Sequence, residues 1–547
     1  MISNLPDEIW SQIFDLAADE DILFQHGFPT VMAESAWYKD PFVDMLPTPQ
    51  DNRRWSLESM RWRLRSPQEA MNLLQRRSYA TKKAIISTCR QWRNVGSEFL
   101  FRCLHFSDPS KMITLCSILD KSASSTTTVT SSFGWWTRRI HLSRYHPSPS
   151  QGLTLQDLEN ALVSIIRHCP NLEIFVVERP MGEAFGPVAD ALAMYSSRKL
   201  HTVQWNVPGA SLAKVIWALN SLPNIVAAHI DVESPVPVAQ EYAHLGSASG
   251  YPLKLPFLQQ LSLRGYVEEV VEQAAGWDLP SLRGFSIDSG ASALDVPDVV
   301  EFVRAHGLSL ALLDLNCHPL LDVAAILDLC PNLSTFTFNA DWDIPSELVH
   351  HPHPNLTAIG LHGLGAAFGV GYSAATSVDP VRTKITQRLN ELNVSALTRR
   401  NFPKLARVRA LSRTMLNDLN RADGPSVENG GYARWNKWWN ACAGNGIKLE
   451  DCTGQALGTL PQEEEEEDDQ EDEEEEEEDE SEEDDSDGWG SEEEEEATGY
   501  NVPPLPAGNG RTMELTRLLQ EVRAMNEERD EALISRIRIP RPDSPGI

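Results

Sequence analysis

The chain has 547 residues and a formal net charge of −32, but 27 of its carboxylates lie between residues 463 and 496, so the rest carries only −5. This length predicts three or four units of domain size, and the lack of a broad basic region argues against direct DNA or RNA binding. No window of about 18 uninterrupted apolar residues occurs, which predicts no membrane span. Asp7 and Glu8 stand where a secretory signal would need apolar residues.

The first helix is predicted over residues 5–17, Leu-Pro-Asp-Glu-Ile-Trp-Ser-Gln-Ile-Phe-Asp-Leu-Ala. Pro6 can open a helix because the N–H that proline lacks would be unpaired there, and the acidic residues after it favour the positive end of the helix dipole. Apolar residues then recur at helical spacing from Ile9 and Ile13 onward. The broad apolar face predicts that one part fills a core and another part meets a partner.

A second amphipathic pattern follows in residues 83–106, which contain Cys89-Arg90-Gln91-Trp92-Arg93 and then Phe-Leu-Phe-Arg-Cys-Leu at 99–104. With the Leu-Pro-x-Glu-Ile start, this pattern resembles the last helix and exit strand of an F-box. The resemblance covers residues 1–24 and 79–106, so the domain is predicted over 1–110 with an insertion at about 24–78. The alternative is an ordinary pair of amphipathic helices that begins a helical domain.

The insertion is not predicted to be one long helix, because Pro29, Pro41, Pro47 and Pro49 interrupt its first part. Its end, residues 67–77, has the proline-first and basic-last pattern of a helix. The aromatic residues of the insertion predict that it packs against another part of the protein; they are Trp37, Tyr38, Trp55 and Trp62. After it we expect a short helix over 112–119, a flexible loop over 121–134 and a second module from about Trp135.

Internal repeats dominate this second module. The unit is a proline followed by an apolar anchor two residues later and then a short strand. The anchors are Leu172, Ile225, Leu258, Leu282, Leu333, Leu356 and Leu405, with copies that lack the proline at Leu200 and Leu310. Most steps are near one or two units of about 25 residues. Helices are predicted ahead of several anchors, over 155–168, 210–222, 296–305 and 323–329.

A helix, a proline-marked turn and a strand per unit resemble a degenerate leucine-rich repeat, whose units stack with the strands along one concave side. The alternative is a general α/β domain whose turns contain proline. The predicted fold class is therefore α/β: an N-terminal helical F-box, a leucine-rich-repeat-like solenoid over 135–457 and a disordered acidic tail. The tryptophan-rich helix over 432–443 is a candidate cap for the open end of the solenoid.

Residues 462–497 form a polyacidic tract that cannot bury apolar surface and is predicted to be disordered. Ser481 and Ser491 precede runs of acidic residues and are possible phosphorylation sites. Residues 511–538 predict a short amphipathic helix, a candidate coiled coil. The tract could bind basic proteins such as histones, or it could serve only as a solubilising tail.

No catalytic, cofactor-binding or metal-binding residue is predicted. A Gly-x-x-x-x-Gly-Lys-Ser/Thr or Gly-x-Ser-x-Gly motif is missing, the glycines at 363–369 do not match a dinucleotide-binding spacing, and the histidines at 350–353 lack further ligands. The eight cysteines form no Cys-x-x-Cys pair, which predicts reduced thiols in a cytoplasmic or nuclear protein.

The combined F-box and repeat resemblance implies a non-catalytic substrate receptor in a ubiquitin conjugation pathway. By that resemblance, Leu5, Pro6, Ile9, Ile13 and Trp92 bind a Skp-type adaptor and, through it, a cullin. The repeats would hold an unknown protein substrate. The competing hypothesis is an acidic scaffold or chaperone that binds basic partners through residues 463–496.

Overall fold

The structure is a computed structural model. It describes residues 5–39, 62–108, 110–125, 132–143, 154–182, 185–233, 245–289, 299–317, 321–342, 344, 352–370 and 380–460. The acidic tract at 462–497, Ser481, Ser491 and the helix expected over 511–538 all lie outside the described residues.

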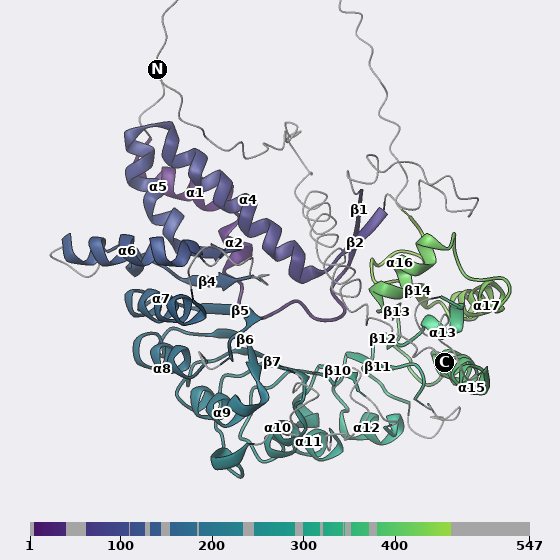
Figure 1. Cartoon of the computed structure of the whole chain (residues 1–547). Helices are drawn as coiled ribbons and strands as arrows, with labels where there is room; N and C mark the ends of the chain where they lie inside the picture. The colour runs from purple at the N-terminus through teal and green to yellow at the C-terminus, as the bar shows by residue number, and fades with distance from the viewer. Residues whose placement is uncertain are drawn as a thin grey trace, which may run out of the picture.

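A 12-stranded sheet runs through the described chain, and its strands are neighbours in sequence order from β3 to β14. Every pairing within it is parallel. The strands are β3 (Cys103–Phe106), β4 (Arg139–Leu142), β5 (Ile174–Pro180), β6 (Thr202–Pro208), β7 (Ala227–Glu233), β8 (Gln260–Gly265), β9 (Gly284–Asp288), β10 (Leu312–Asn316), β11 (Thr335–Asn339), β12 (Ala358–His362), β13 (Arg407–Ala410) and β14 (Lys448–Glu450). The sheet curves into an arc, with the strands on the inside (Figure 1).

The apolar anchors found in the sequence set the register of this sheet. Each lies two residues before the first paired residue of its strand, as Leu258 lies before Gln260, and the two copies without proline follow the same rule. All of these anchors are fully buried: Leu172, Leu200, Ile225, Leu258, Leu282, Leu310, Leu333, Leu356 and Leu405. The predicted α/β solenoid is confirmed at this level, as a stack of strand and helix units.

The asparagine between proline and anchor has a separate role. Its Nδ2 donates to a main-chain carbonyl of the preceding turn, at 2.9 Å for Asn171 on Trp135, 2.9 Å for Asn224 on Arg198 and 2.8 Å for Asn332 on Leu308. These bonds satisfy carbonyl groups that a turn would otherwise leave without a partner. The Pro-Asn pattern therefore joins each unit to the one before it.

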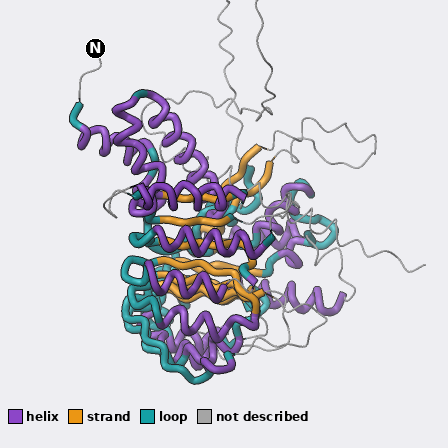
Figure 2. Tube along the Cα trace, turned by 60° about the vertical axis from the view of Figure 1, so that its left-hand side comes forward, coloured by secondary structure: helices purple, strands orange, loops and turns teal. Residues whose placement is uncertain are grey.

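Helices cover the outer side of the arc, as Figure 2 shows most clearly along the stacked strands. They are α6 (Ser110–Ser125), α7 (Leu155–His168), α8 (Phe185–Tyr195), α9 (Leu212–Asn220), α10 (Glu268–Ala274), α11 (Val299–His306), α12 (Val323–Leu329), α13 (Gly365–Phe368), α15 (Pro380–Ala396) and α17 (Gly431–Gly444). The helices predicted over 155–168 and 323–329 are confirmed at those bounds, and α9 begins two residues later than expected. Helix α11 is described from Val299, and the first residues of the helix expected over 296–305 lie outside the described residues. None of the described helices has the length and apolar character needed to cross a bilayer.

Helix α6 is longer than we predicted, because it continues to Ser125 into the segment expected to be a loop. Its last turns are held from within the fold: Leu119 is buried, and the Ser122 Oγ accepts a hydrogen bond from the Phe133 N–H at 3.1 Å. The serine-rich segment that we expected to be flexible therefore contains a serine, Ser122, that is buried and hydrogen-bonded.

The N-terminal part contains α1 (Asp7–Ala17), α2 (Glu20–Leu23), α4 (Pro67–Thr88), α5 (Arg90–Arg102) and an antiparallel pair of strands, β1 (Ala36–Lys39) with β2 (Trp62–Arg65). Helix α4 starts at the predicted Pro67 but continues beyond 77 to Thr88, with a capping box between Ser66 and Glu69. Because α5 leads directly into β3, the sheet begins at Cys103, earlier than the Trp135 start that we expected.

Residues 24–35, which we call the strap, connect α2 to β1 across the concave side of the sheet (Figure 1). Near β8, the Phe28 N–H donates to the Gln260 Oε1 at 2.9 Å, and the Gln260 Nε2 donates to the Phe28 carbonyl at 3.2 Å. At the other end, Met32 packs with Ala358 and Leu411. The predicted insertion thus packs against the repeats themselves.

The far end of the strap is fixed by a buried arginine. Arg409 donates to the Met32 carbonyl and pairs with Glu34 at 3.0 Å and with Glu450 at 2.6 Å. The Ser35 N–H donates to the Cys452 carbonyl at 2.6 Å. The two anchored ends connect strands β6–β8 to strands β12–β14.

Gly360 on β12 leaves no room for a side chain where Met32 of the strap packs against the sheet. A Cβ atom there would lie 2.6 Å from Thr337 Cγ2, 2.7 Å from Leu411 Cδ1 and 2.9 Å from Met32 Sδ. We expect Gly360→Ala to lower the free energy of unfolding by about 1–3 kcal/mol through overpacking, measured by urea denaturation.

The matched control is Gly284→Ala on β9, where an added Cβ would have its nearest neighbours at 3.9 Å. We expect it to leave the urea midpoint nearly unchanged. Equal stability of the two variants would contradict this account of the strap.

Candidate functional site

The two halves of the F-box-like pattern lie together. Trp10 and Phe14 of α1 are buried against Ile85 of α4 and Phe99 of α5. Trp92 packs on the edge of this cluster, with its ring centroid 4.6 Å from that of Trp10 and 5.3 Å from that of Phe14. The side chains separated by some eighty residues in sequence therefore form one small core.

The residues that we expected to bind the adaptor are spread over the outside of this core. Leu5 and Trp92 are half-buried against it, while Pro6 is exposed. Ile9 and Ile13 are 40% and 39% exposed, and Leu16 one turn later is 58% exposed. These three side chains form an apolar row on the side of α1 that is not packed against α4 and α5.

Buried charges fix α1 and α2 to the longer helices. Lys82 of α4 lies 2.7 Å from Glu20 of α2, and both side chains are almost fully buried. Arg102 of α5 also contacts Glu20 at 2.7 Å and reaches Asp15 at 2.8 Å. Because removing one partner of a buried pair typically costs about 3–5 kcal/mol, this network holds the apolar row in a fixed position on the rest of the protein.

The same face of α4 continues toward the concave side of the sheet with polar residues. Gln68 and Asn72 donate to the Glu178 carboxylate at 2.9 and 3.2 Å. The Gln75 Nε2 lies 2.7 Å from the His141 Nδ1, and the His141 Nε2 lies 3.0 Å from Glu178. Since the Gln75 amide donates to Nδ1, the imidazole proton is on Nε2 and is donated to Glu178.

These contacts decide the charge of the cluster. Burial would raise the pKa of Glu178, but the hydrogen bonds from His141, Gln68 and Asn72 outweigh it and hold that pKa well below its usual range. Burial lowers the pKa of His141. Glu178 is therefore an ionised acceptor surrounded by donors, with no role left for it as a proton donor at neutral pH.

A row of mostly polar residues crosses the whole concave face, with one residue from each strand. In sheet order it is His105, His141, Val176, Gln204, His229, Ser262, Ser286, Asp314, Thr337, Gly360, Arg409 and Glu450. We did not identify this row from the sequence. Its signal is the polar residue between two core residues of most strands, such as Ser262 between Leu261 and Leu263.

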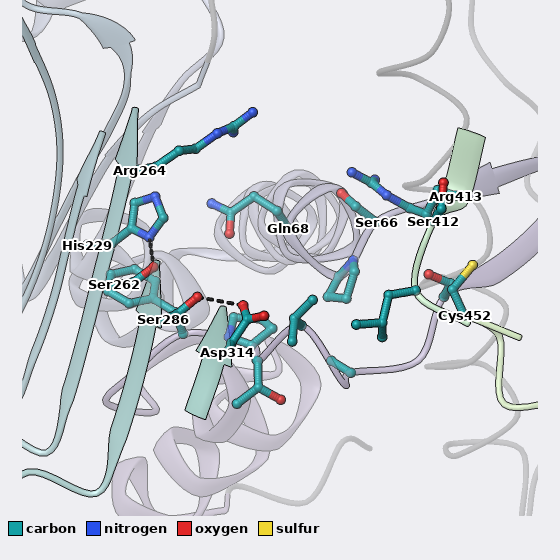
Figure 3. Close-up of a pocket in the computed structure, with 18 of the residues that line it drawn as sticks. Ser66, Gln68, His229, Ser262, Arg264, Ser286, Asp314, Ser412, Arg413 and Cys452 are labelled. Atoms are coloured by element: carbon teal, nitrogen blue, oxygen red, sulfur yellow. Dashed lines mark hydrogen bonds between the residues drawn. The ribbon is translucent and has the colours of Figure 1, made fainter. Parts of the chain in front are cut away.

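A cavity of about 860 Å³ lies between this row, the strap, the start of α4 and the start of α16 (Arg413–Arg421). Figure 3 shows Arg264 and Gln68 extending into it, with Arg413 on the opposite side. At its base, Asp314 accepts hydrogen bonds from Ser286 at 2.6 Å and from Thr337. Its mixture of amide, hydroxyl, guanidinium and carboxylate groups is suited to binding a polar ligand.

The cavity also contains a serine, a histidine and an aspartate, but they are not arranged as a proton relay. The His229 Nδ1 contacts the Ser262 Oγ at 2.9 Å, whereas Asp314 is occupied by Ser286, Thr337 and His362. Burial, followed by the nearby Arg264 charge, lowers the pKa of His229 to about 4. Such an imidazole is a poor base for Ser262 at neutral pH.

Metal binding has no support within the ranges that the structure describes, where no group of three or more His, Cys, Asp or Glu could hold an ion. His353, from the histidine-rich segment at 350–353, is buried and its Nε2 contacts the Cys330 carbonyl at 2.9 Å. That histidine therefore has a structural partner.

No protein-family model matches this sequence, and no curated protein matches it either. One solved structure that this chain matches is the crystal structure of a structural-genomics target from Bacteroides fragilis. The two sequences are 12% identical, the match covers 79% of this chain and 96% of that one, and the TM-score is 0.27. A likeness this weak carries no structural or functional argument.

The low pKa of His229 makes stability depend on pH. Its pKa of about 4 in the folded protein lies below the ordinary value of 6.5, so the unfolded chain binds more protons between these values. Stability is therefore lost as pH falls from 6.5 toward 4, by roughly 3 kcal/mol at the full shift. We expect His229→Gln, which can still bond Ser262, to reduce this loss, measured by urea denaturation across that range.

Other groups also change their protonation between pH 6.5 and 4. The test is therefore the difference between the pH profiles of the wild type and the variant. Burial lowers the pKa of His105 to about 3, which acts in the same direction, and raises the pKa of Asp451 to about 6, which acts in the opposite direction. Parallel pH profiles for the two proteins would contradict the assignment to His229.

Proposed function

We propose that this chain is the non-catalytic substrate-recognition subunit of a Skp–cullin–F-box ubiquitin ligase, working in the cytoplasm or nucleus. The observation that supports it most is the exposed apolar row of Ile9, Ile13 and Leu16, on a helix whose other side packs with Trp92. Contiguous exposed apolar residues next to polar ones are typical of a protein-binding surface. The F-box resemblance assigns the small Skp-type adaptor to that surface.

The position of α4 supports a mechanism based on proximity. This helix has 22 residues, a length of roughly 33 Å. One end packs with α1 through Ile85 and pairs with Glu20 of α2 through Lys82, and the other end lines the cavity through Pro67 and Gln68. An adaptor on α1 and a target in the concave cavity would be held by one rigid element, which raises the effective concentration of the target near the ubiquitin-loaded enzyme.

The test is recovery of the adaptor and a cullin with the tagged full-length protein. We expect the double variant Leu5→Ala with Pro6→Ala to abolish recovery, because it removes the apolar start of the α1 surface. A second variant, Ile9→Ser with Ile13→Ser, changes exposed side chains and should have the same effect without disturbing the core.

The matched control is Leu308→Ala, an apolar side chain that is 70% exposed in the turn that follows α11. It should bind the adaptor like the wild type. Undiminished recovery in both α1 variants, with unchanged thermal stability, would remove the ligase assignment.

The acidic-scaffold alternative is supported by the 27 carboxylates at 463–496. It predicts capture of basic proteins such as histones, weakened by salt because exposed charges are screened within about 8 Å at physiological ionic strength. Deletion of 463–496 would abolish that capture and leave adaptor recovery unchanged. The two functions are therefore separated by one pull-down with two variants.

A further inference from the structure

The strap shows how the concave face binds an extended chain. Gln260 contacts both the N–H and the carbonyl of Phe28, which is the pairing that a neighbouring strand would make. The preceding Gly27 has φ of +101°, a conformation that glycine adopts without strain. The Phe28 ring packs near His229, with centroids 5.9 Å apart. A side-chain amide thus binds peptide backbone on this surface.

Two further carboxamides line the cavity on the same surface, and the Oε1 of one of them, Gln204, accepts a hydrogen bond from the Gln68 Nε2 at 3.3 Å. Gln204 lies beside His229 in the polar row, and Asn206 lies two residues along β6; both line the cavity. Asn206 is only 8% exposed, and its Oδ1 has no hydrogen-bond partner among the described residues. A buried acceptor without a donor is unfavourable, so a peptide N–H placed here would relieve that cost.

Arg264 supplies a charged contact. Its side chain is 51% exposed, its nearest carboxylates are Asp288 at 3.5 Å and Asp231 at 4.0 Å, and it makes no hydrogen bond with the described part of the chain. Figure 3 shows its guanidinium extending over the cavity. A guanidinium in this state can form two parallel hydrogen bonds with an incoming carboxylate or phosphate.

The rest of the lining limits the ligand. Glu178, Asp231, Asp314 and Asp418 also line the cavity, so a polyanion such as nucleic acid would be repelled. A folded partner would need roughly 800 Å² of open surface, and the strap crosses the face that would have to supply it. A single extended segment fits within a cavity of about 860 Å³.

We propose that this cavity binds an extended peptide segment of a partner protein, with the peptide backbone contacted by Gln204 and Asn206 and one anionic side chain contacted by Arg264. This inference rests on the proposed function in one respect, that the partner would be the substrate of the ligase. The anionic side chain is an aspartate, a glutamate or a phosphorylated residue, which present the same chemistry to a guanidinium.

The test uses the purified full-length protein and a library of fluorescent synthetic peptides of about nine residues. Each peptide is made in four forms with Asp, Glu, phosphoserine or Gln at its centre, and binding is measured by fluorescence anisotropy. We expect selected anionic forms to bind at least about tenfold more tightly than the Gln form, a difference of about 1.4 kcal/mol. Comparison of the Asp and Glu forms with the phosphoserine form shows whether the site prefers a carboxylate or a phosphate.

Variants locate the site. Arg264→Gln should remove the preference for the anionic forms, and Asn206→Ala should weaken all forms. The matched control Arg283→Gln, at an exposed arginine that is not among the residues lining the cavity, should bind like the wild type. Thermal unfolding of each variant shows whether it remains folded, and Arg264→Lys, which keeps the charge without the planar fork, should lose part of the preference.

The proposal is overturned if no peptide binds more tightly than about 1 mM, or if Arg264→Gln and Arg283→Gln bind the anionic peptides equally. Its failure is distinct from failure of the proposed function. Peptide binding should persist in the Leu5→Ala and Pro6→Ala double variant, and adaptor recovery should persist in Arg264→Gln.

Discussion

The arrangement of this protein depends on the buried polar face of α4. Gln68, Asn72, Gln75, Ser78 and Lys82 follow one another at helical spacing, and each has a partner in another element. A buried polar group that loses its partner typically costs about 1–3 kcal/mol, so any displacement of α4 would break several such contacts together. The polar face of α4 therefore fixes the position of the helix. An apolar face of the same area would tolerate more displacement, because apolar contacts are not directional.

The strap adds a constraint on curvature. From Phe28 to Met32 the chain can extend roughly 13–14 Å, whereas strands β8 and β12, to which these residues are attached, are separated by roughly 19 Å along the sheet. The difference is made up by the bend of the arc and by the side chains of Gln260 and Met32. A flatter sheet would stretch or release the strap, so strap and curvature stabilise each other.

What the sequence could predict follows from the range of the interactions. The solenoid units were predictable because a proline, an anchor such as Leu258 and a strand lie within a few residues of each other. Helix α4 was predicted over residues 67–77, and residues from 83 onward were assigned to a second helical pattern. The two were not joined, because the buried residues between them, Ser78 and Lys82, are polar and an apolar periodicity search does not detect them. The strap, the polar row and the cavity combine residues such as Phe28, Gln260 and Arg409 that are far apart in sequence, and no local pattern relates them.

The two parts of the candidate site, the α1 surface and the cavity, differ in how much of them a local sequence pattern could predict. Ile9 and Ile13 belong to a helix with its own sequence signal, so their exposure followed from amphipathic spacing. Arg264 was only one of many charged residues until the register placed it between Asp231 and Asp288 over the cavity. Because α4 contacts Glu178 through Gln68 at the cavity and Glu20 of α2 through Lys82 near the other end, it fixes the position of the cavity relative to the α1 surface.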